Sequence, residues 1–456
     1  MNGLLITVVV AIFFALIGLY FSRKKPESVD AYIISKNALG SRTLSLTIFA
    51  TGMGVWILFG PAEALLTAGL FALFCYALSS TLSLWMFAFL GEKIRKVNPD
   101  GKSLTEFVLA RFGTPMYLLI LAVTAVYMAL GVTAALSGIG LASSAVFGMQ
   151  EWQTILIIGG AALSYTALGG FRVSVETDKI QTYVILPLFA LLVGACMFYL
   201  GDMNAAFQAA HIPEFGQWGM EYGIALLIGV LSAEAFNQVW WQRVYSGKDE
   251  KAMRRGFFLA GVVVFPVVFL AGLIGVYSAL APVEGSASTA IFNFLPLVPQ
   301  WLSVSAMILA ITLTMSTMDS FLNSMAGLFL IDIKRLVPAM SDTKLIRIAQ
   351  MLTVVFAAIT MFLAVQGFSV LYLFLVADLV CAGAVFAVFY GMFSKTSDAR
   401  VAFIASVLGI LCGALLFPDP DFTRGTLVGS FAVALILPAV IVLAFGRGKR
   451  EPSARG

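Results

Sequence analysis

The stretch FATGMGVWILFGP (residues 49–61) lies in an apolar run, residues 43–69, that is long enough as a helix to cross a bilayer. Three glycines and Pro61 weaken a helix at this point. Backbone that leaves the helix at membrane depth is tolerated only inside protein or beside a cavity. The stretch therefore predicts a broken membrane helix with free carbonyls near residues 50–53. The alternative interpretation is that the glycines only allow close helix packing.

The composition places this run in a polytopic membrane protein. Of 456 residues, 60% are hydrophobic and 11% are charged, about half the charged fraction of an ordinary soluble domain. Thirteen apolar runs follow one another from residues 3–22 to residues 425–446. No gap between them could form a separate core, so we expect a single transmembrane domain over residues 1–456. The net charge of +4 is small and scattered, which excludes a nucleic-acid partner.

The basic residues predict the topology. If the N-terminus is outside, every Lys and Arg except Arg424 falls in a cytoplasmic segment, and the tail from Arg447 is cytoplasmic too. We therefore expect a multi-pass protein of the plasma (inner) membrane, in contact with lipids, with its N-terminus outside and its C-terminus cytoplasmic. A functional monomer is expected.

Five acidic residues fall inside apolar runs. Each costs several kcal/mol at membrane depth unless it is paired or hydrated, so each is a functional candidate. No Lys or Arg is expected well inside a run, because Arg172, Lys179 and Arg243 lie near the cytoplasmic ends. The acids then require protons, metal ions or a cationic solute. They are Glu63, Asp178, Glu234, Asp319 and Asp378.

The stretch LTMSTMDSFLNS (residues 313–324) gathers oxygen atoms on one helix. Ser316, Asp319, Ser320 and Asn323 recur at three- or four-residue spacing and share a face, with a threonine beside them. Hydroxyl, carbonyl and carboxylate oxygens suit hard cations such as Na⁺. The alternative is that the hydroxyls bond back to carbonyls one turn earlier.

Five motifs in sequence order resemble those of the sodium:solute symporter family. They are YIISKNALG (32–40), LTEFVLARFG (104–113), GGFRVSVETDKIQ (169–181), FNQVWWQR (236–243) and MSTMDSFLNS (315–324). The resemblance covers nearly the whole chain. It implies an all-α membrane protein of LeuT-like fold, with an inverted repeat of five plus five helices. The repeats would span about residues 43–200 and 220–393, with one extra helix before them and two after. A second helix break is expected near residues 234–237.

The resemblance also implies ion sites. A shared sodium site, with Na⁺ as the coupling ion, would take backbone carbonyls and hydroxyls from Ala50, Met53, Leu313, Ser316 and Thr317. A second cation site would take Asp178, Asp319 and Ser320, and Asp319 could instead carry a proton.

The implied function is sodium-coupled symport of a small organic solute by alternating access. No buried arginine is expected, which disfavours an anion, so a neutral or cationic solute of the urea or polyamine kind is expected. The candidate solute-binding residues are Thr51, Gly54, Trp56, Tyr76, Glu234, Asn237 and Asp378. The alternatives are a proton-coupled symporter of the same fold and a membrane sensor built on it. An intramembrane enzyme is not expected, because the GxGD context of presenilin-type proteases is absent.

Overall fold

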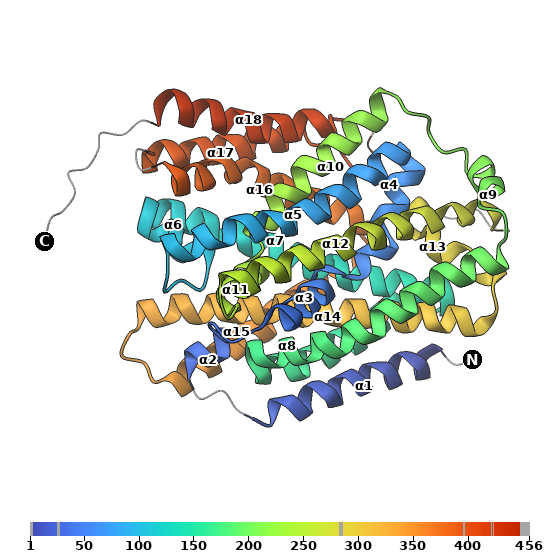
Figure 1. The fold of residues 1–456 in the computed structure, drawn as a ribbon, viewed down its shortest axis with the longest axis horizontal. Coiled ribbons are helices and arrows are strands. Elements are labelled where there is room, and N and C mark those ends of the chain that lie inside the picture. Colours follow the sequence, from blue (N-terminus) through green and yellow to red (C-terminus); the bar gives the residue numbers. More distant parts are fainter. Residues whose placement is uncertain are drawn as a thin grey trace, which may run out of the picture.

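The computed structural model describes residues 3–24, 28–281, 286–394, 397–420, 422 and 424–446. This part of the chain is helical and contains no strand. Most helices run along the long axis of the molecule, side by side (Figure 1). The helices of the N-terminal half are α1 (Gly3–Ser22), α2 (Val29–Ile33), α3 (Ser41–Gly52), α4 (Gly60–Ala68), α5 (Leu70–Val97), α6 (Leu104–Phe112), α7 (Thr114–Phe147), α8 (Glu151–Tyr199) and α9 (Met203–Ala209).

The C-terminal half continues the bundle in the same way. Its helices are α10 (Gln217–Phe236), α11 (Gln238–Ser246), α12 (Glu250–Ile274), α13 (Ala290–Asn293), α14 (Gln300–Leu336), α15 (Asp342–Ala364), α16 (Val370–Phe393), α17 (Ala399–Leu416) and α18 (Leu427–Phe445). Short 3₁₀ turns occur at Val55–Leu58 (η1), Gly275–Leu280 (η2), Ala287–Thr289 (η3) and Leu295–Leu297 (η4).

The all-α membrane fold expected from the sequence is confirmed. Eleven helices of the described chain are long and apolar enough to span a membrane, or twelve if one bent pair counts as a span. That count treats α8 as one helix, although its 49 residues would measure about 74 Å. The expected count of thirteen stays a prediction, which depends on counting the two parts of α8 separately.

The break predicted in the first glycine-rich stretch is present. Helix α3 ends at Gly52, Met53 and Gly54 are not helical, and α4 starts at Gly60 after the turn η1. The two arms are bent by 55°. The Phe49 carbonyl still accepts from the Met53 amide, but in the described structure the carbonyls of Ala50 and Thr51 lack the amide partners that a continuing helix would supply.

The second expected break lies between α10 and α11. Asn237 is extended at this point, and its side-chain oxygen accepts a hydrogen bond from the amide of Val239, which caps α11. Every residue of α11 is buried. The described structure therefore has a helix break at each of the two places where the sequence predicted one. The repeat boundaries at about 43–200 and 220–393 stay a prediction.

Helix α8 is kinked at Gly170. This residue has a φ of +64°, which side chains rarely adopt, and a Cβ there would lie 2.7 Å from the Tyr32 carbonyl oxygen. The Tyr32 hydroxyl donates to the Ala167 carbonyl at 2.9 Å, so α2 is fixed against the kink. The kink positions the second part of α8, which carries Asp178.

Helix α14 is the centre of the bundle. Residues 309–328 are buried without exception, and α14 packs against α8, α7, α15 and α3. The helices that meet it in the middle of the molecule include both the first broken helix and the second part of α8. Polar side chains on α14 can therefore contact several elements far apart in the sequence.

The two ends of the described chain lie at opposite ends of the molecule. Helix α1 starts at the right-hand end of Figure 1, and α18 ends at the left-hand end. Which end faces the cytoplasm stays a prediction. Lys395 and the basic tail from Arg447, which entered the topology prediction, lie outside the described residues.

We predict that Gly170→Ala lowers the stability of the folded protein. The left-handed backbone and the contact with the Tyr32 carbonyl leave no strain-free place for a methyl group, and such strain costs about 1–3 kcal/mol. Gly160→Ala in the same helix is the control, because a Cβ at Gly160 meets nothing within 4 Å. Thermal unfolding of purified protein should show a lower midpoint for the first variant only. Equal midpoints would contradict the assignment of strain to Gly170.

Candidate functional site

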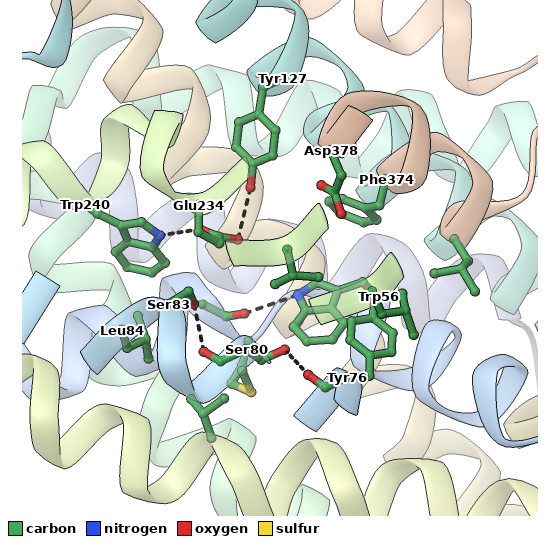
Figure 2. A pocket seen from close by; sticks show the side chains of 16 residues that line it. Trp56, Tyr76, Ser80, Ser83, Leu84, Tyr127, Glu234, Trp240, Phe374 and Asp378 are labelled. Atoms are coloured by element: carbon green, nitrogen blue, oxygen red, sulfur yellow. Dashed lines mark hydrogen bonds between the residues drawn. The ribbon is translucent and has the colours of Figure 1, made fainter. Parts of the chain in front are cut away.

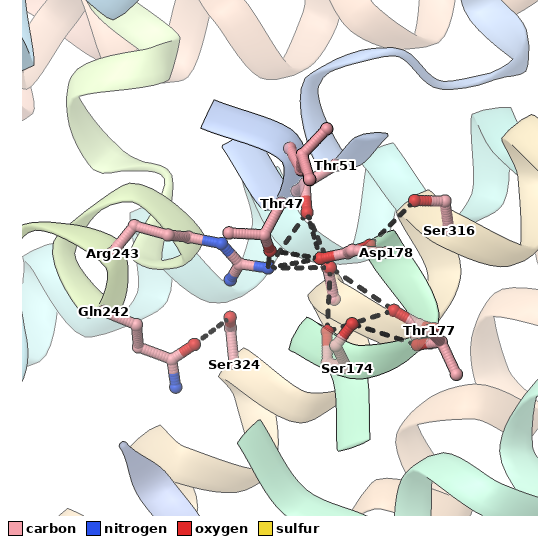
Figure 3. Close-up of polar contacts among 12 residues, drawn as sticks. Thr47, Thr51, Ser174, Thr177, Asp178, Gln242, Arg243, Ser316 and Ser324 are labelled. Atoms are coloured by element: carbon pink, nitrogen blue, oxygen red, sulfur yellow. Dashed lines mark hydrogen bonds and ion pairs between the residues drawn. The ribbon is translucent and has the colours of Figure 1, made fainter. Parts of the chain in front are cut away.

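An ion pair lies in the middle of the bundle. The Arg243 guanidinium of α11 contacts the Asp178 carboxylate of α8 at 3.1 Å, and both side chains are fully buried. Asp178 also accepts hydrogen bonds from the hydroxyls of Thr47, Thr51 (3.1 Å) and Ser316 (2.9 Å). Figure 3 shows these side chains converging from α3, α8, α11 and α14.

The expectation that no arginine lies deep inside the protein is therefore wrong. Arg243 was placed near a membrane surface because it follows an apolar run closely. The run is broken at Asn237, however, and α11 turns into the bundle, where its whole length is buried. A buried charge of this kind requires a partner, which Asp178 provides.

A second carboxylate, Asp319 of α14, lies beside this pair and has no basic side chain bonded to it in the described structure. Its carboxylate accepts hydrogen bonds from Tyr165 (3.0 Å), Ser174 (3.2 Å), Thr177 (2.9 Å) and Ser320 (3.3 Å). With both acids ionised, Asp178, Asp319 and Arg243 together carry one net negative charge.

The hydroxyls of α14 fall into two groups. Thr312 and Thr314 bond back to carbonyls four residues earlier, as the alternative interpretation expected. Ser316 instead donates to Asp178, and Ser320 lies within 2.8 Å of the Thr51 hydroxyl. Back-bonding is therefore wrong as a general account of the stretch, whose central hydroxyls point across to other helices.

The residues expected to form the shared sodium site are all buried. Thr317 is the informative member, because its hydroxyl oxygen is buried and has no hydrogen-bond partner in the described structure. It lies against the break in the first helix, since a Cβ at Gly54 would be only 2.6 Å from this oxygen. An unbonded buried hydroxyl beside free carbonyls is a donor set that fits Na⁺.

Asp178, Arg243 and Asp319, with the hydroxyl groups bonded to them, form what we call the ion cluster. A cavity lies beside it, at both helix breaks (Figure 2). Aromatic side chains form much of its wall, and the rings of Trp56 and Tyr76 stack with centroids 5.3 Å apart. The lining residues are Gly52, Met53, Trp56, Tyr76, Ser80, Ser83, Leu84, Tyr127, Leu226, Val230, Glu234, Trp240, Val264, Leu371, Phe374 and Asp378.

Two carboxylates face this cavity, and no basic side chain lines it in the described structure. Glu234 accepts hydrogen bonds from the Tyr127 hydroxyl (3.0 Å), the Asn237 amide (2.9 Å) and the indole of Trp240. Asp378 accepts no hydrogen bond from the described residues, and with only 3% of its surface exposed it is also largely shielded from water. It lies near enough to Glu234 for the two charges to interact.

The structure places the expected solute-binding residues in three groups. Trp56, Tyr76, Glu234 and Asp378 line the cavity. Asn237 supports Glu234 from outside the lining, and Gly54 lies against Thr317. Thr51 points away from the cavity, because its hydroxyl contacts Asp178, Ser320 and Arg243.

Helix α11 connects the ion cluster and the cavity. Trp240 lines the cavity and donates to Glu234, and Arg243, three residues later, binds Asp178. Gln242, between them, donates to the Ile33 carbonyl and accepts from Ser324. A displacement of α11 would therefore change both sites.

Several residues of the site were not expected from the sequence. They are Arg243 and Thr47 beside Asp178, the donors Tyr165, Ser174 and Thr177 around Asp319, and Ser80 and Ser83 in the cavity wall. One signal pointed to Arg243. A buried acid needs a cation, and this arginine closes the same FNQVWWQR motif whose start marks the helix break.

Comparison with known proteins identifies related chains. A sequence model of the sodium:solute symporter family matches residues 32–409. A spermidine transporter of Candida albicans is 27% identical over 88% of this chain and 77% of its own length. A sodium/glucose cotransporter of Vibrio parahaemolyticus is 25% identical over 88% of this chain and 83% of its own. These relatives are transporters and not enzymes.

Solved structures show the same fold. A Na⁺-coupled sialic acid symporter in a substrate-bound, outward-open state superposes with a TM-score of 0.80 over 99% of both chains, at 16% identity. Mhp1, a nucleobase-cation-symport-1 family transporter, superposes with a TM-score of 0.57 over 91% of this chain and 94% of its own, at 13% identity. The likeness shows that the fold is LeuT-like.

We predict that Asp178 and Arg243 are energetically coupled. Removing one partner of a buried ion pair leaves an uncompensated charge and costs about 3–5 kcal/mol. Asp178→Asn and Arg243→Gln should each lower the thermal midpoint in K⁺ buffer, and the double variant should lose less than the sum of the two. Unfolding of all three variants and the wild type gives the interaction energy. Additive losses would show that the pair does not interact.

Proposed function

Since the chain belongs to the sodium:solute symporter family, we propose that it couples inward movement of Na⁺ to uptake of a small organic cation of the amine or polyamine kind. The solute would bind in the cavity between Trp56, Glu234 and Asp378. The ion would bind at the end of α3, against Ser316 and Thr317 of α14.

The uncompensated negative charge of the cavity carries the proposal about the solute. Two carboxylates face a largely buried space, and none of the described residues that line it is basic. At membrane depth such charges are retained when a ligand or an ion neutralises them. An ammonium group satisfies this requirement, and it also binds favourably to the faces of Trp and Tyr rings. An anionic solute would be repelled.

The two acids would act differently towards the solute. Glu234 is held by three donors, which favour its ionised form and fix its orientation. Asp378 accepts no hydrogen bond from the residues that the structure describes, so an ammonium N–H would give its carboxylate a first one. The similarity to a spermidine transporter supports an amine solute, although it rests on 27% identity.

Charge balance supports sodium coupling. Asp178, Asp319 and Arg243 leave one negative charge in the ion cluster. One Na⁺ beside Thr317 would neutralise it, and the ligand oxygens would be the Thr317 and Ser316 hydroxyls with the carbonyls of Ala50, Met53 and Leu313. These oxygens belong to the broken helix and to α14. The ion would therefore hold the two elements together.

Coupling follows from this bridge. If Na⁺ binds one conformation better than the other, it shifts the population towards that conformation, and a solute that prefers the same conformation binds more tightly. Inward movement of one Na⁺ releases about 2.3 kcal/mol per 100 mV of membrane potential. We propose that transport takes place in the plasma (inner) membrane, with the N-terminus outside, the C-terminus cytoplasmic, and a monomer as the functional unit.

Coupling to protons is the competing proposal. Asp319 is buried, and among the described residues its carboxylate is bonded by hydroxyl groups alone, so one proton could balance the cluster in place of Na⁺. Uptake of radiolabelled spermidine into proteoliposomes separates the two. A Na⁺ gradient at equal pH should drive accumulation, and a pH gradient without Na⁺ should not. Absence of any driven uptake would favour the sensor alternative.

We predict that Ser316→Ala combined with Thr317→Ala abolishes the stimulation of uptake by Na⁺. Coupling of typical strength gives about 5- to 150-fold stimulation, and removing both hydroxyls removes the ion ligands that α14 side chains supply. Thr314→Ala is the matched control, because this buried hydroxyl on the same helix bonds, within the described chain, to the Ala310 carbonyl alone. Full sodium stimulation in the double variant would disprove the site.

We predict that Asp378→Asn weakens binding of the solute. Truncating one partner of a buried charge pair costs about 2–5 kcal/mol, so KM for spermidine should rise by at least about 30-fold. Asp100→Asn is the control, because Asp100 is exposed on the surface, where it pairs with Lys36. The kinetics of uptake check this, and an unchanged KM would remove Asp378 from the solute site.

A further inference from the structure

One nitrogen of Arg243 lies in a cage of oxygen atoms. Nη2 contacts the hydroxyl of Thr51 at 2.9 Å, that of Ser320 at 3.0 Å and that of Thr47 at 3.2 Å. The fourth contact is the Asp178 carboxylate at 3.1 Å. The four oxygens belong to α3, α8 and α14, so a single cationic group joins three helices (Figure 3).

This cage suits a small spherical cation better than it suits a guanidinium. One carboxylate and three hydroxyls are hard oxygen ligands of the kind that Na⁺ takes. A guanidinium has five N–H donors in a planar fork, and it is best satisfied by several acceptors around that plane. Here Nε and Nη1 are buried and have no hydrogen-bond partner in the described structure. The guanidinium carbon also lies 5.3 Å from the centre of the Phe171 ring.

We propose that Arg243 is a tethered cation that occupies a built-in second sodium site, so that the protein moves one Na⁺ per solute. The inference rests on the sodium coupling proposed above and goes beyond it, because it fixes the number of ions. Removing the positive charge of Arg243 opens the cage of Thr47, Thr51, Asp178 and Ser320 to a second Na⁺.

The balance of charges also indicates that removing the charge of Arg243 admits a second Na⁺. In the wild type, Arg243 and one Na⁺ balance Asp178 and Asp319. In Arg243→Gln the two carboxylates face one Na⁺, and a second Na⁺ in the cage restores neutrality. The cage oxygens remain in this variant, because they come from helices other than α11. Arg243→Lys keeps the positive charge and therefore keeps the cage closed to a free ion.

The position of Arg243 links its charge to the solute site more directly than a free ion could be linked. It lies one helical turn from Trp240, which lines the solute cavity and donates to Glu234. A free ion senses the solute only through the conformation of the helices. Arg243 is covalently part of the element that contacts the solute, so its charge moves with α11 without leaving the protein.

The experiment counts ions. Reversal potentials of spermidine-coupled current in proteoliposomes, measured over a series of Na⁺ gradients, give the number of Na⁺ moved per solute. Binding of ²²Na⁺ to purified protein gives the number of sites independently. We expect one Na⁺ per solute in the wild type and in Arg243→Lys, and two in Arg243→Gln. The Hill coefficient for activation of uptake by Na⁺ should be near 1 in the wild type and greater than 1 in Arg243→Gln. Arg42→Gln, at an exposed arginine, is the control and should match the wild type.

Two sodium ions per solute in the wild type would overturn the inference, and this measurement does not depend on any variant folding. One sodium ion in an active Arg243→Gln protein would also overturn it, because the residue would then be only a structural partner of Asp178. Solute uptake that no Na⁺ gradient drives would instead refute the sodium coupling proposed above. The two failures are therefore distinguishable.

Discussion

Charge neutrality at membrane depth is the constraint on which the rest of this structure depends. Asp178 and Asp319 are fully buried, and removing each from water costs several kcal/mol in practice. Arg243 compensates one of these charges, and hydroxyl groups of α8 and α14 donate hydrogen bonds to the other. The cluster is held together by its polar contacts, but it is not complete. With both acids ionised one negative charge remains, and under the function proposed above a bound ion would balance it in one conformation.

The fold meets this constraint by breaking helices instead of adding charges. At Gly52 the backbone itself becomes a source of carbonyl oxygens, which could bind a cation without a further buried carboxylate. At Asn237 the second break turns α11 inwards, which delivers Arg243 to Asp178 across 65 residues of sequence. Both breaks also line the cavity, through Gly52 and Met53 on one side and Glu234 and Trp240 on the other. The ion cluster and the cavity are therefore adjacent because they share the same interruptions.

The sequence predicted the fold better than it predicted the contacts. Glycines, Pro61 and the length of the apolar run were local signals, so the first break was predictable. The face of α14 was also predictable from spacing, and Ser316 and Ser320 do point to other helices. The partner of Asp178 was not predicted, because an arginine at the end of an apolar run normally lies at the membrane surface. Only the inward turn of α11 buries it. Thr51 was expected at the cavity, but its face of α3 could not be assigned while the direction of the break was unknown.

The contrast between the two carboxylates of the cavity extends the same argument to the solute. Both lie in one largely buried space, yet Glu234 has three donors and Asp378 has none among the described residues. A carboxylate with fixed donors keeps its place whether or not a ligand is bound. A carboxylate without donors depends on the ligand to compensate its desolvation, so it discriminates strongly between a cation and a neutral solute. Under the function proposed above, selectivity for a positively charged solute would arise at Asp378, and Glu234 would connect that selectivity to the ion cluster through Trp240 and α11.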